Sequence, residues 1–501
     1  MRNQGLGSWP ARRARMTPDR VALSHRGDHR TYRDLRTRTD RLAHALRGLG
    51  VRRGDRVAYL GVNHPALVET FFAAGLLGAV FVPLNHRLTA PELSFVVEDA
   101  GAAIVLLGDG QDGSGLPGRH VPAGDYERLV ASGAPGPIDE PVDRDDPCLI
   151  MYTSGTTGHP KGAVLTHANL TWNVVNLLVD VPFAHDEVTL ISAPLFHIAA
   201  LAQTLLPSVL KGGRAILEPS FDVARVFDLI ETERVTVMFG VPSMFGFLAR
   251  SPRWPSADLS SLRHLLCGGA PVPMPLIRSY EERGLTLLQG YGMTETAPGA
   301  LFLAAEHAAD KAGSAGVPCF FTDVRLVAPD GSDAAPGEPG EVYVRGPNVM
   351  PGYWRRPEET AKVLSPDGWF RSGDLGVADE DGYVRISDRI KDMIISGGEN
   401  VYPAEVESAL YGHAAVAECA VIGVPDERWG EVGKALVVLR PGATARPADL
   451  LAHLDGRLAR YKIPKYLEFV AELPRNAAGK LLKAPLRARY GDPARTGGAD
   501  G

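Results

Sequence analysis

The stretch "MYTSGTTGHPKGAVLTHANL", residues 151–170, holds glycines and small hydroxyl residues between two apolar segments. Glycines leave backbone N–H groups free to form a concave surface of donors for anionic oxygens. Lys161 adds a single positive charge of the kind that suits phosphate. "CLIMYT" before the loop is typical of a buried strand, and "THANLTWNVVNLL" after it is typical of a helix. We therefore expect a phosphate-binding loop that links a strand to a downstream helix.

The spacing of this loop differs from that of a Walker A loop, which requires G-x-x-x-x-G-K-[ST]. Gly155 and Gly158 are separated by two residues, and Lys161 is followed by Gly162. A flexible surface linker is the alternative, but linkers rarely lie between a buried strand and a helix with a lone lysine at their end. The sequence favours a phosphate loop of a different design.

The bulk composition is that of a globular protein without the basic excess of a nucleic-acid-binding surface. The 501 residues are 45% hydrophobic and 22% charged, and the net charge of −6 argues against nucleic acid as a partner. The four cysteines are far apart, which fits neither a disulfide framework nor a C-x-x-C motif. Residues 1–16 lack the apolar core of a signal peptide, and the longest apolar run, 71–84, is shorter than the ~20 residues of a membrane span. We expect a cytoplasmic protein.

Arginine is concentrated near the N-terminus. Fifteen arginines and five aspartates within residues 1–56 give this segment a local net charge of +10. One interpretation is a solvated amphipathic helix over residues 33–48. The leucines of its inner face would be Leu35, Leu42, Leu46 and Leu49. The alternative is a basic patch that contacts anionic lipid at a membrane surface or a polyphosphate ligand.

Strand-like apolar runs alternate with helical patterns through most of the chain, which favours helices packed on both faces of largely parallel sheets. Such runs include "RVAYLGV" (56–62), "AAIVLLG" (102–108), "DPCLIMYTSG" (146–155) and "VTLISAP" (188–194). From about residue 315 short β-rich segments with turns predominate. From about residue 392 helical and strand-like segments alternate again over ~100 residues, which suits a small domain.

These patterns predict an α/β fold with a large N-terminal domain of layered, helix-flanked sheets. A β-rich subdomain is expected over about 315–388, and a small α+β C-terminal domain over 392–490. Residues 491–501, rich in Gly, Asp and Ala, are expected to be disordered.

"YTSGTTGHPKG" resembles the signature of the adenylate-forming superfamily of acyl-CoA synthetases, aryl-CoA ligases, luciferases and peptide-synthetase adenylation domains. Its other motifs follow in order: "PLFHIAAL" (194–201), "CGGAP" (267–271), "QGYGMTE" (289–295), "WFRSGDLG" (369–376), "SDRIKDMIISGGENVYPAEVE" (387–407) and "PRNAAGKLLK" (474–483). The resemblance covers the chain except its tail. "IISGGENVYPAEVE" and "PDERWGE" are most similar to fatty-acyl and aryl-acyl CoA ligases.

The resemblance implies a reaction in two steps. A carboxylate attacks the α-phosphate of ATP and pyrophosphate leaves; the thiol of coenzyme A then displaces AMP from the acyl adenylate. The first step brings one anion onto another, so the site must neutralise charge. By resemblance, Lys480 approaches the carboxylate and the bridging oxygens, and Thr294 donates to the α-phosphate. Glu295 binds Mg²⁺, with Thr156 helping to hold the metal-bound phosphates.

The resemblance also assigns the nucleotide contacts. Tyr291 stacks on adenine, unless it is merely a buried tyrosine in a turn. Asp374 accepts from the ribose hydroxyls, and Arg389 reaches the same sugar. The expected ATP and AMP contacts are Thr153, Ser154, Gly155, Thr156, Thr157, Gly158, Lys161, Gly268, Gly269, Ala270, Tyr291, Gly292, Thr294, Asp374 and Arg389.

Superfamily members carry a small C-terminal domain that swings on a hinge between the two half-reactions. The implied boundaries are residues 1–388 for the N-terminal domain, 389–391 for the hinge and 392–490 for the mobile domain. Lys391 matches the hinge position, and Gly398 matches the lining of the tunnel for coenzyme A.

The acyl pocket is expected between the helix after His197 and the segment after Glu295. His197 resembles the aromatic residue that closes the pocket near the carboxylate, with a structural histidine as the alternative. The pocket residues implied are His197, Ala200, Gly290, Met293, Ala297 and Pro298. "HIAALAQTLL" contains no acid to pair with an amino group, and neither it nor "TAPGALFL" contains a cation for a second carboxylate. Because an unpaired buried charge is costly, we expect an apolar monocarboxylic acid, fatty or aryl.

The leading hypothesis is an ATP-dependent acyl-CoA ligase that uses Mg²⁺ and coenzyme A. A second hypothesis keeps acid adenylation but transfers the acyl group to a carrier-protein thiol or another nucleophile. A third is a non-catalytic nucleotide-binding protein, which the presence of Lys480, Glu295 and Lys161 disfavours. A hydrolase of the nucleophile-elbow type is excluded because G-x-S-x-G does not occur. The sequence specifies no oligomeric state.

Replacing Gly398 with leucine tests the tunnel assignment. A side chain at this position is expected to block the approach of the thiol while leaving the nucleotide site intact. The Gly398→Leu variant should keep acid-dependent pyrophosphate release and lose thioester formation. Equal loss of both half-reactions would contradict the assignment.

Overall fold

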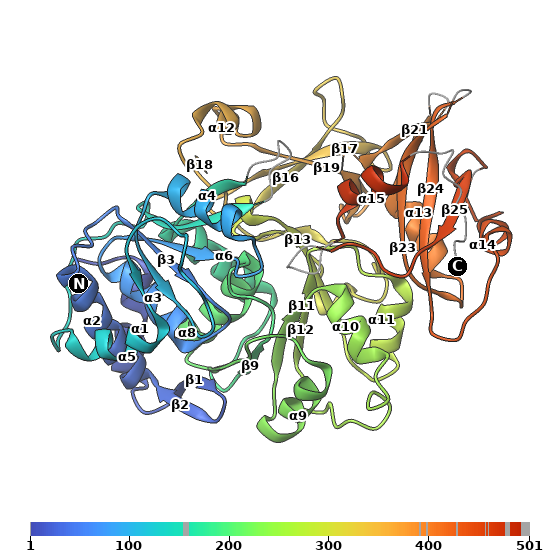
Figure 1. The fold of residues 1–501 in the computed structure, drawn as a ribbon. Coiled ribbons are helices and arrows are strands. Elements are labelled where there is room, and N and C mark those ends of the chain that lie inside the picture. The colour runs from blue at the N-terminus through green and yellow to red at the C-terminus, as the bar shows by residue number, and fades with distance from the viewer. Residues whose placement is uncertain are drawn as a thin grey trace.

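Two large sheets with mainly parallel centres form the body of the protein (Figure 1). The computed structural model describes residues 2–153, 160–389, 392–396, 399–426, 429–455, 457–458, 460–475 and 481–491. The strands of the first sheet, in spatial order, are β15 (Val317–Pro318), β14 (Gly299–Phe302), β13 (Leu287–Gly292), β12 (His264–Gly268), β11 (Val237–Gly240), β9 (Val188–Ile191), β10 (Arg214–Leu217), β1 (Val21–His25) and β2 (Asp28–Thr31). Strands β13, β12, β11, β9, β10 and β1 run parallel to one another, so their carboxyl ends meet at one edge.

The second sheet lies on the N-terminal side. Its strands, in order, are β18 (Gly352–Tyr353), β8 (Lys161–Thr166), β7 (Pro147–Thr153), β4 (Val80–Leu84), β3 (Arg56–Leu60), β5 (Ala102–Leu107) and β6 (His120–Val121). A continuous hydrophobic core joins residues of both large sheets and the helices between them. The strand–helix alternation of the sequence therefore becomes layered α/β packing, as predicted.

Two smaller sheets follow in the chain. The third sheet is antiparallel and contains β16 (Asp323–Val327), β17 (Pro339–Arg345), β19 (Phe370–Ala378) and β20 (Val384–Arg389). The fourth contains β22 (Glu399–Val401), β21 (Ile394–Ser396), β24 (Gly430–Leu439), β23 (Val416–Asp426) and β25 (Tyr466–Phe469). The fourth sheet has its own apolar clusters, which confirms a small C-terminal α+β unit.

Helices flank the sheets along the length of the molecule (Figure 1). Those of the N-terminal part are α1 (Trp9–Met16), α2 (Tyr32–Gly48), α3 (Pro65–Leu76), α4 (Ala90–Ala100), α5 (Ala123–Ser132), α6 (His167–Asp180), α7 (Ile198–Ala200), α8 (Leu206–Lys211), α9 (Val223–Glu233), α10 (Pro242–Ala249), α11 (Met274–Glu281) and α12 (Pro357–Val363). Those of the C-terminal part are α13 (Pro403–Tyr411), α14 (Pro447–Leu454) and α15 (Lys483–Tyr490).

Helix α2 confirms the amphipathic helix predicted over residues 33–48. Thr31 and Asp34 form a capping box, in which the Asp34 N–H donates to Thr31 Oγ1 at 3.1 Å and the Thr31 N–H donates to Asp34 Oδ2 at 2.9 Å. The side chains of Leu35, Leu42 and Leu46 are fully buried. The helix thus packs its leucines inward, and Arg33 lies exposed on its outer face, whereas Arg38 reaches a buried carboxylate.

Several N-terminal arginines pair with acids that lie far along the chain. These pairs are Arg2 with Asp139, Arg47 with Glu140 and Arg53 with Asp146. The local excess of +10 is therefore compensated in part by carboxylates brought in by the fold.

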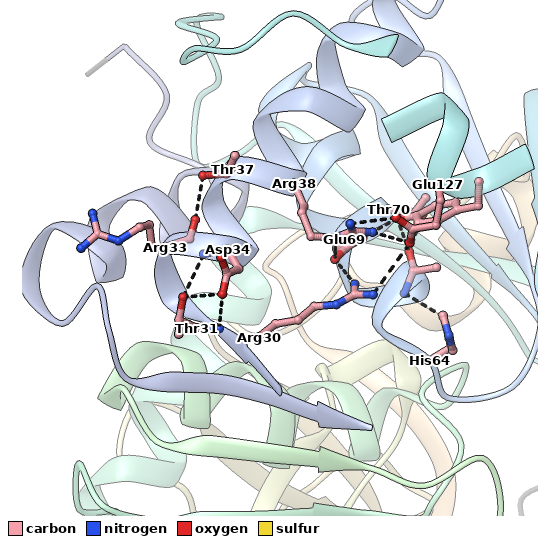
Figure 2. A network of polar contacts seen from close by, with 12 residues as sticks. Arg30, Thr31, Arg33, Asp34, Thr37, Arg38, His64, Glu69, Thr70 and Glu127 are labelled. Carbon is pink, nitrogen blue, oxygen red and sulfur yellow. Dashed lines mark hydrogen bonds and ion pairs between the residues drawn. The ribbon is translucent and has the colours of Figure 1, made fainter. Parts of the chain in front are cut away.

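A buried carboxylate joins four elements of the N-terminal layer (Figure 2). Glu69 of α3 is fully buried, and its side chain pairs with Arg30 of β2 and with Arg38 of α2, the latter at 2.7 Å. The hydroxyl of Tyr126, from α5, donates to Glu69 Oε2 at 2.7 Å. Since a buried charge must be paired and hydrogen-bonded, this network fixes α2, α3 and α5 around β2.

The structure places no cysteine of its described residues at the surface. All four cysteines are buried, and their thiols are free. Among the described residues, no helix is both long enough and apolar enough to cross a bilayer.

Replacing Glu69 with glutamine leaves Arg30 and Arg38 beside a neutral group in a buried position. We expect the free energy of unfolding to fall by about 3 kcal/mol, measured by urea denaturation. Glu127→Gln is the matched control, because Glu127 also pairs with Arg38 but its side chain is 64% exposed. The control should cost less than about 1 kcal/mol. Equal costs would contradict the assigned role of Glu69.

Candidate active site

Glycines at the carboxyl ends of β12 and β13 allow a close backbone approach. Gly268 pairs with Gly290, and a Cβ on Gly268 would lie 2.9 Å from the carbonyl oxygen of Gly290. A Cβ on Gly292 would lie only 1.6 Å from the carbonyl oxygen of Pro298. No other residue fits these positions without moving the backbone. In open α/β sheets, ligands bind at this edge.

Two of the predicted nucleotide residues contact each other. The Tyr291 hydroxyl at the end of β13 donates to Asp374 Oδ2 of β19 at 2.8 Å, and Asp374 is only 5% exposed. The backbone of Asp374 lies opposite that of Arg389 in the β19–β20 register. The first and third sheets therefore bring Tyr291, Asp374 and the Arg389 backbone to one place.

Two antiparallel strands flank the predicted phosphate loop, and the downstream helix follows the second strand. Strand β7 ends at Thr153, and Lys161 begins the antiparallel strand β8, with Thr153 opposite Lys161. Helix α6 begins only at His167, after a capping box of Thr166 and Asn169. The helix expected downstream of the loop is therefore present, and a strand that the sequence did not predict, "KGAVLT", pairs back onto β7 between them.

Lys161 and Glu295 are linked through one tyrosine. The side chain of Lys161 is 16% exposed, pairs with Glu359 of α12, and has its Nζ 5.6 Å from the centre of the Tyr353 ring. The Tyr353 hydroxyl donates to Glu295 Oε1 at 2.8 Å. The cation expected at the phosphates and the carboxylate expected at the metal thus share a common neighbour.

Glu295 suits Mg²⁺ by its chemistry. It is a hard oxygen donor, 9% exposed, on the short 3₁₀ turn Thr294–Thr296. Within the described ranges, no group of three or more His, Cys, Asp or Glu side chains could hold a metal by itself. One carboxylate is sufficient when phosphates and waters complete the octahedron of Mg²⁺.

His197 lies at the start of α7, against Phe196, with 4.8 Å between the two ring centres. Burial lowers its pKa from the ordinary 6.5 to about 4, and the nearby Arg87 acts in the same direction. Its Nε2 atom is buried and makes no hydrogen bond within the part of the chain that the structure describes. A neutral histidine with an unused ring nitrogen is suited to contact a ligand near its carboxylate.

The two predicted walls of the acyl pocket meet at buried asparagines. One wall continues from α7 into a π-helical turn, Leu201–Leu205, of the kind often found at functional sites. Asn173 of α6 donates to the Ala202 carbonyl at 3.2 Å and accepts from the Gly299 N–H at 2.9 Å, so it joins this wall to the other. Asn348 donates to the carbonyl of Gly299 at 2.6 Å.

The asparagines of α6 were not among the predicted site residues, although the sequence contains a signal for them. Asn169, Asn173 and Asn176 recur at helical spacing in "NLTWNVVNLL", and all three are buried. Polar side chains on the face of a helix that should be apolar indicate specific hydrogen bonds. Asn348 and Tyr353 carried no such local signal.

The other predicted residues divide into three groups. Gly290, Met293 and Thr294 are half-buried at the site, and Gly269 and Ala270 are exposed in the loop after β12. Ala200, Ala297 and Pro298 are buried. The predictions for Ser154, Gly155, Thr156, Thr157, Gly158, Lys391, Gly398 and Lys480, and for the tail beyond Gly491, lie outside the described residues.

Comparisons with known proteins agree with this geometry. Residues 10–354 match the family described as AMP-binding enzyme, and residues 405–480 match the AMP-binding enzyme C-terminal domain. A feruloyl-CoA synthase of Amycolatopsis sp is 58% identical over 496 residues, covering 98% of this chain and 100% of that protein. An indoleacetate–CoA ligase of Aromatoleum aromaticum is 42% identical, covering 96% of this chain and 97% of that protein.

A solved structure shows the same architecture. The o-succinylbenzoate CoA synthetase of Bacillus subtilis, in complex with its acyl-adenylate intermediate, has a TM-score of 0.88 and 36% identity, covering 96% of this chain and 98% of that one. Another structure of that synthetase contains ATP and a magnesium ion.

The chain belongs to the AMP-binding enzyme family. It is an ATP-dependent acyl-CoA ligase, an acid–thiol ligase that forms AMP. Its reaction uses ATP, Mg²⁺ and coenzyme A, which confirms the cofactors predicted from the sequence.

The low pKa of His197 makes stability depend on pH. As pH falls below 6.5, the unfolded chain takes up a proton that folded His197 accepts only near pH 4, so stability is lost between these values. His197→Gln removes this loss, worth about 1.4 kcal/mol per pH unit within the window. Urea denaturation across the window measures it. A pH dependence that is the same in both proteins would contradict the assignment.

Proposed function

We propose that the acid is a hydroxyl-bearing aryl acid of the hydroxycinnamic class, to which ferulic acid belongs. The observation that carries this proposal is a neutral amide, Gln203, in one of two pocket walls that contain no charged side chain. The similarity to feruloyl-CoA synthases along nearly the whole chain supports the same class.

The absence of charge in the walls favours a single carboxylate. Residues 197–206 and 296–303 contain no Asp, Glu, Lys or Arg. A second carboxylate or an ammonium group would be desolvated without a partner there, at a cost of several kcal/mol. Dicarboxylic and amino acids are therefore disfavoured.

Gln203 supplies the polar contact. It is half-buried in the π-helical turn, and a Cβ on Gly299 would lie 3.7 Å from its Nε2 atom. Its side chain makes no hydrogen bond to any other described residue, so its donors and acceptor are available. A ring hydroxyl offers both a donor and an acceptor to such an amide, whereas a fatty chain offers neither.

The site residues receive the following roles in this proposal. Lys161 and Glu295 offset the negative charge of the triphosphate, the first directly and the second through Mg²⁺. Tyr291, Asp374 and Arg389 bind the nucleoside. His197, held neutral, contacts the acid next to its carboxylate without adding charge to it.

Further roles stay predictions: Thr294 at the α-phosphate, Lys480 at the reacting carboxylate, the hinge at 389–391, and the coenzyme A tunnel at Gly398. A carrier-protein acceptor, contact of the arginine-rich N-terminus with a membrane, and a cytoplasmic location also stay predictions.

Pyrophosphate release with a panel of acids, with and without coenzyme A, tests the proposal. We expect ferulate and 4-hydroxycinnamate to be used with a higher kcat/KM than cinnamate, octanoate or a dicarboxylic aryl acid, and acyl-CoA to form. A preference for octanoate would overturn the aryl assignment. Accumulation of acyl adenylate without consumption of coenzyme A would favour a carrier-protein acceptor.

The Gln203→Leu variant distinguishes a hydrogen bond from the Gln203 amide to the acid from an effect of side-chain size on the pocket. Losing the hydrogen bond should lower kcat/KM for 4-hydroxycinnamate by about fivefold to tenfold. Cinnamate is the matched control substrate, since it lacks the ring hydroxyl and should be affected little. An equal loss for both acids would show that Gln203 acts only through packing.

A further inference from the structure

Helix α12 presents a carboxylate to Lys161, the lysine expected at the phosphates. Glu359 pairs with Lys161, and these residues are 198 positions apart in the chain. The other oxygen of the same carboxylate, Oε1, accepts from Lys362 Nζ at 2.5 Å. Glu359 therefore has two cationic partners, one half-buried at the site and one on the outer surface.

The position of Glu359 is fixed by the packing of α12 on the second sheet. Strand β18 pairs antiparallel with β8, placing Tyr353 opposite Ala163, two residues after Lys161. The Tyr353 N–H donates to Thr360 Oγ1 at 2.9 Å, and the Trp354 N–H donates to the Gly162 carbonyl at 2.7 Å. The helix that carries Glu359 is thus attached to the strand that carries Lys161.

The Glu359 carboxylate is ionised at neutral pH. Its hydrogen bond from Lys161, followed by that from Lys362, lowers the pKa of Glu359 from 4.5 to about 2. An ammonium already paired with a carboxylate offers less net positive charge to a polyphosphate, and the carboxylate itself repels phosphate oxygens.

We propose that Glu359 is a positioning residue that competes with phosphate oxygens for Lys161 and so limits the affinity of the site for pyrophosphate. This inference rests on the proposed role of Lys161. Because Lys362 stays paired with the carboxylate, Glu359 keeps a partner when Lys161 turns to a phosphate. Lys161 therefore exchanges between the Glu359 carboxylate and a phosphate at a small cost in free energy, and pyrophosphate leaves more readily.

Glu359→Gln tests this inference, because it removes the charge and keeps the shape. Calorimetric titration with MgATP and with magnesium pyrophosphate measures affinity apart from turnover. Both dissociation constants should fall, with pyrophosphate tightened by up to about fivefold, the range of a partly exposed ion pair. Product inhibition by pyrophosphate should strengthen accordingly, and the KM for ATP should fall more than kcat changes.

Glu358→Gln is the matched control. Glu358 is exposed on the same helix, one residue away, and its loss changes the net charge equally. It should leave both dissociation constants unchanged. If both variants bind the ligands equally more tightly, the effect comes from the change in net charge and not from the pair with Lys161. If Glu359→Gln binds them more weakly, Glu359 assists phosphate binding. Either result would overturn the inference.

The Lys161→Ala background separates this inference from the proposed function. If Lys161 binds the phosphates, Lys161→Ala weakens binding of MgATP and pyrophosphate, and adding Glu359→Gln then restores no comparable tightening. Unchanged affinity in Lys161→Ala would refute the phosphate role itself. Lys161→Ala could weaken binding while Glu359→Gln tightens it by the same factor with and without Lys161. That result would refute only the competition of Glu359 with phosphate for Lys161. Circular dichroism of each variant checks that the fold is retained.

Discussion

The approach of Gly292 to the Pro298 carbonyl determines how the nucleotide and acid parts of the site meet. The backbone turns between these residues so tightly that a Cβ would lie 1.6 Å from that oxygen. Thr296 holds the turn from within, since its hydroxyl donates to the Pro298 carbonyl at 2.6 Å. Tyr291 precedes the turn and Glu295 lies inside it, so the residues expected at the base, the metal and the acid share one short, rigid segment.

That segment is held by side chains from distant parts of the chain. Asn348 donates to the Thr296 carbonyl at 2.9 Å as well as to Gly299, and Thr322 donates to Asn348 Oδ1 at 2.8 Å. Asn173 joins the same region to the π-helical turn. These groups are buried and neutral, so they fix the backbone without introducing a charge beside an apolar acid.

Much of the fold follows from local patterns, and much of the site does not. Helix α2 was predictable from leucine spacing and its capping residues, and the C-terminal helices and strands from their alternation. Strand β8 was not predicted, because its short run "KGAVLT" begins at the loop's own lysine. The pairs Tyr291–Asp374 and Lys161–Glu359 join residues 83 and 198 positions apart, and no single-sequence pattern encodes such pairings. The family motifs indicated which residues gather, but not which of them bind one another.

The burial of all four cysteines has a chemical consequence for an enzyme that makes an activated acyl donor. Cys267 lies next to Gly268, at the edge of the site, yet it is only 2% exposed, and burial raises the pKa of its thiol. Burial likewise raises the pKa of Cys319, behind Gly299, to about 12. Only a thiolate is an effective nucleophile, so these sulfurs stay protonated and inert toward a mixed anhydride formed nearby. The four cysteines are thereby protected from acylation, and an external thiol meets no internal competitor from them.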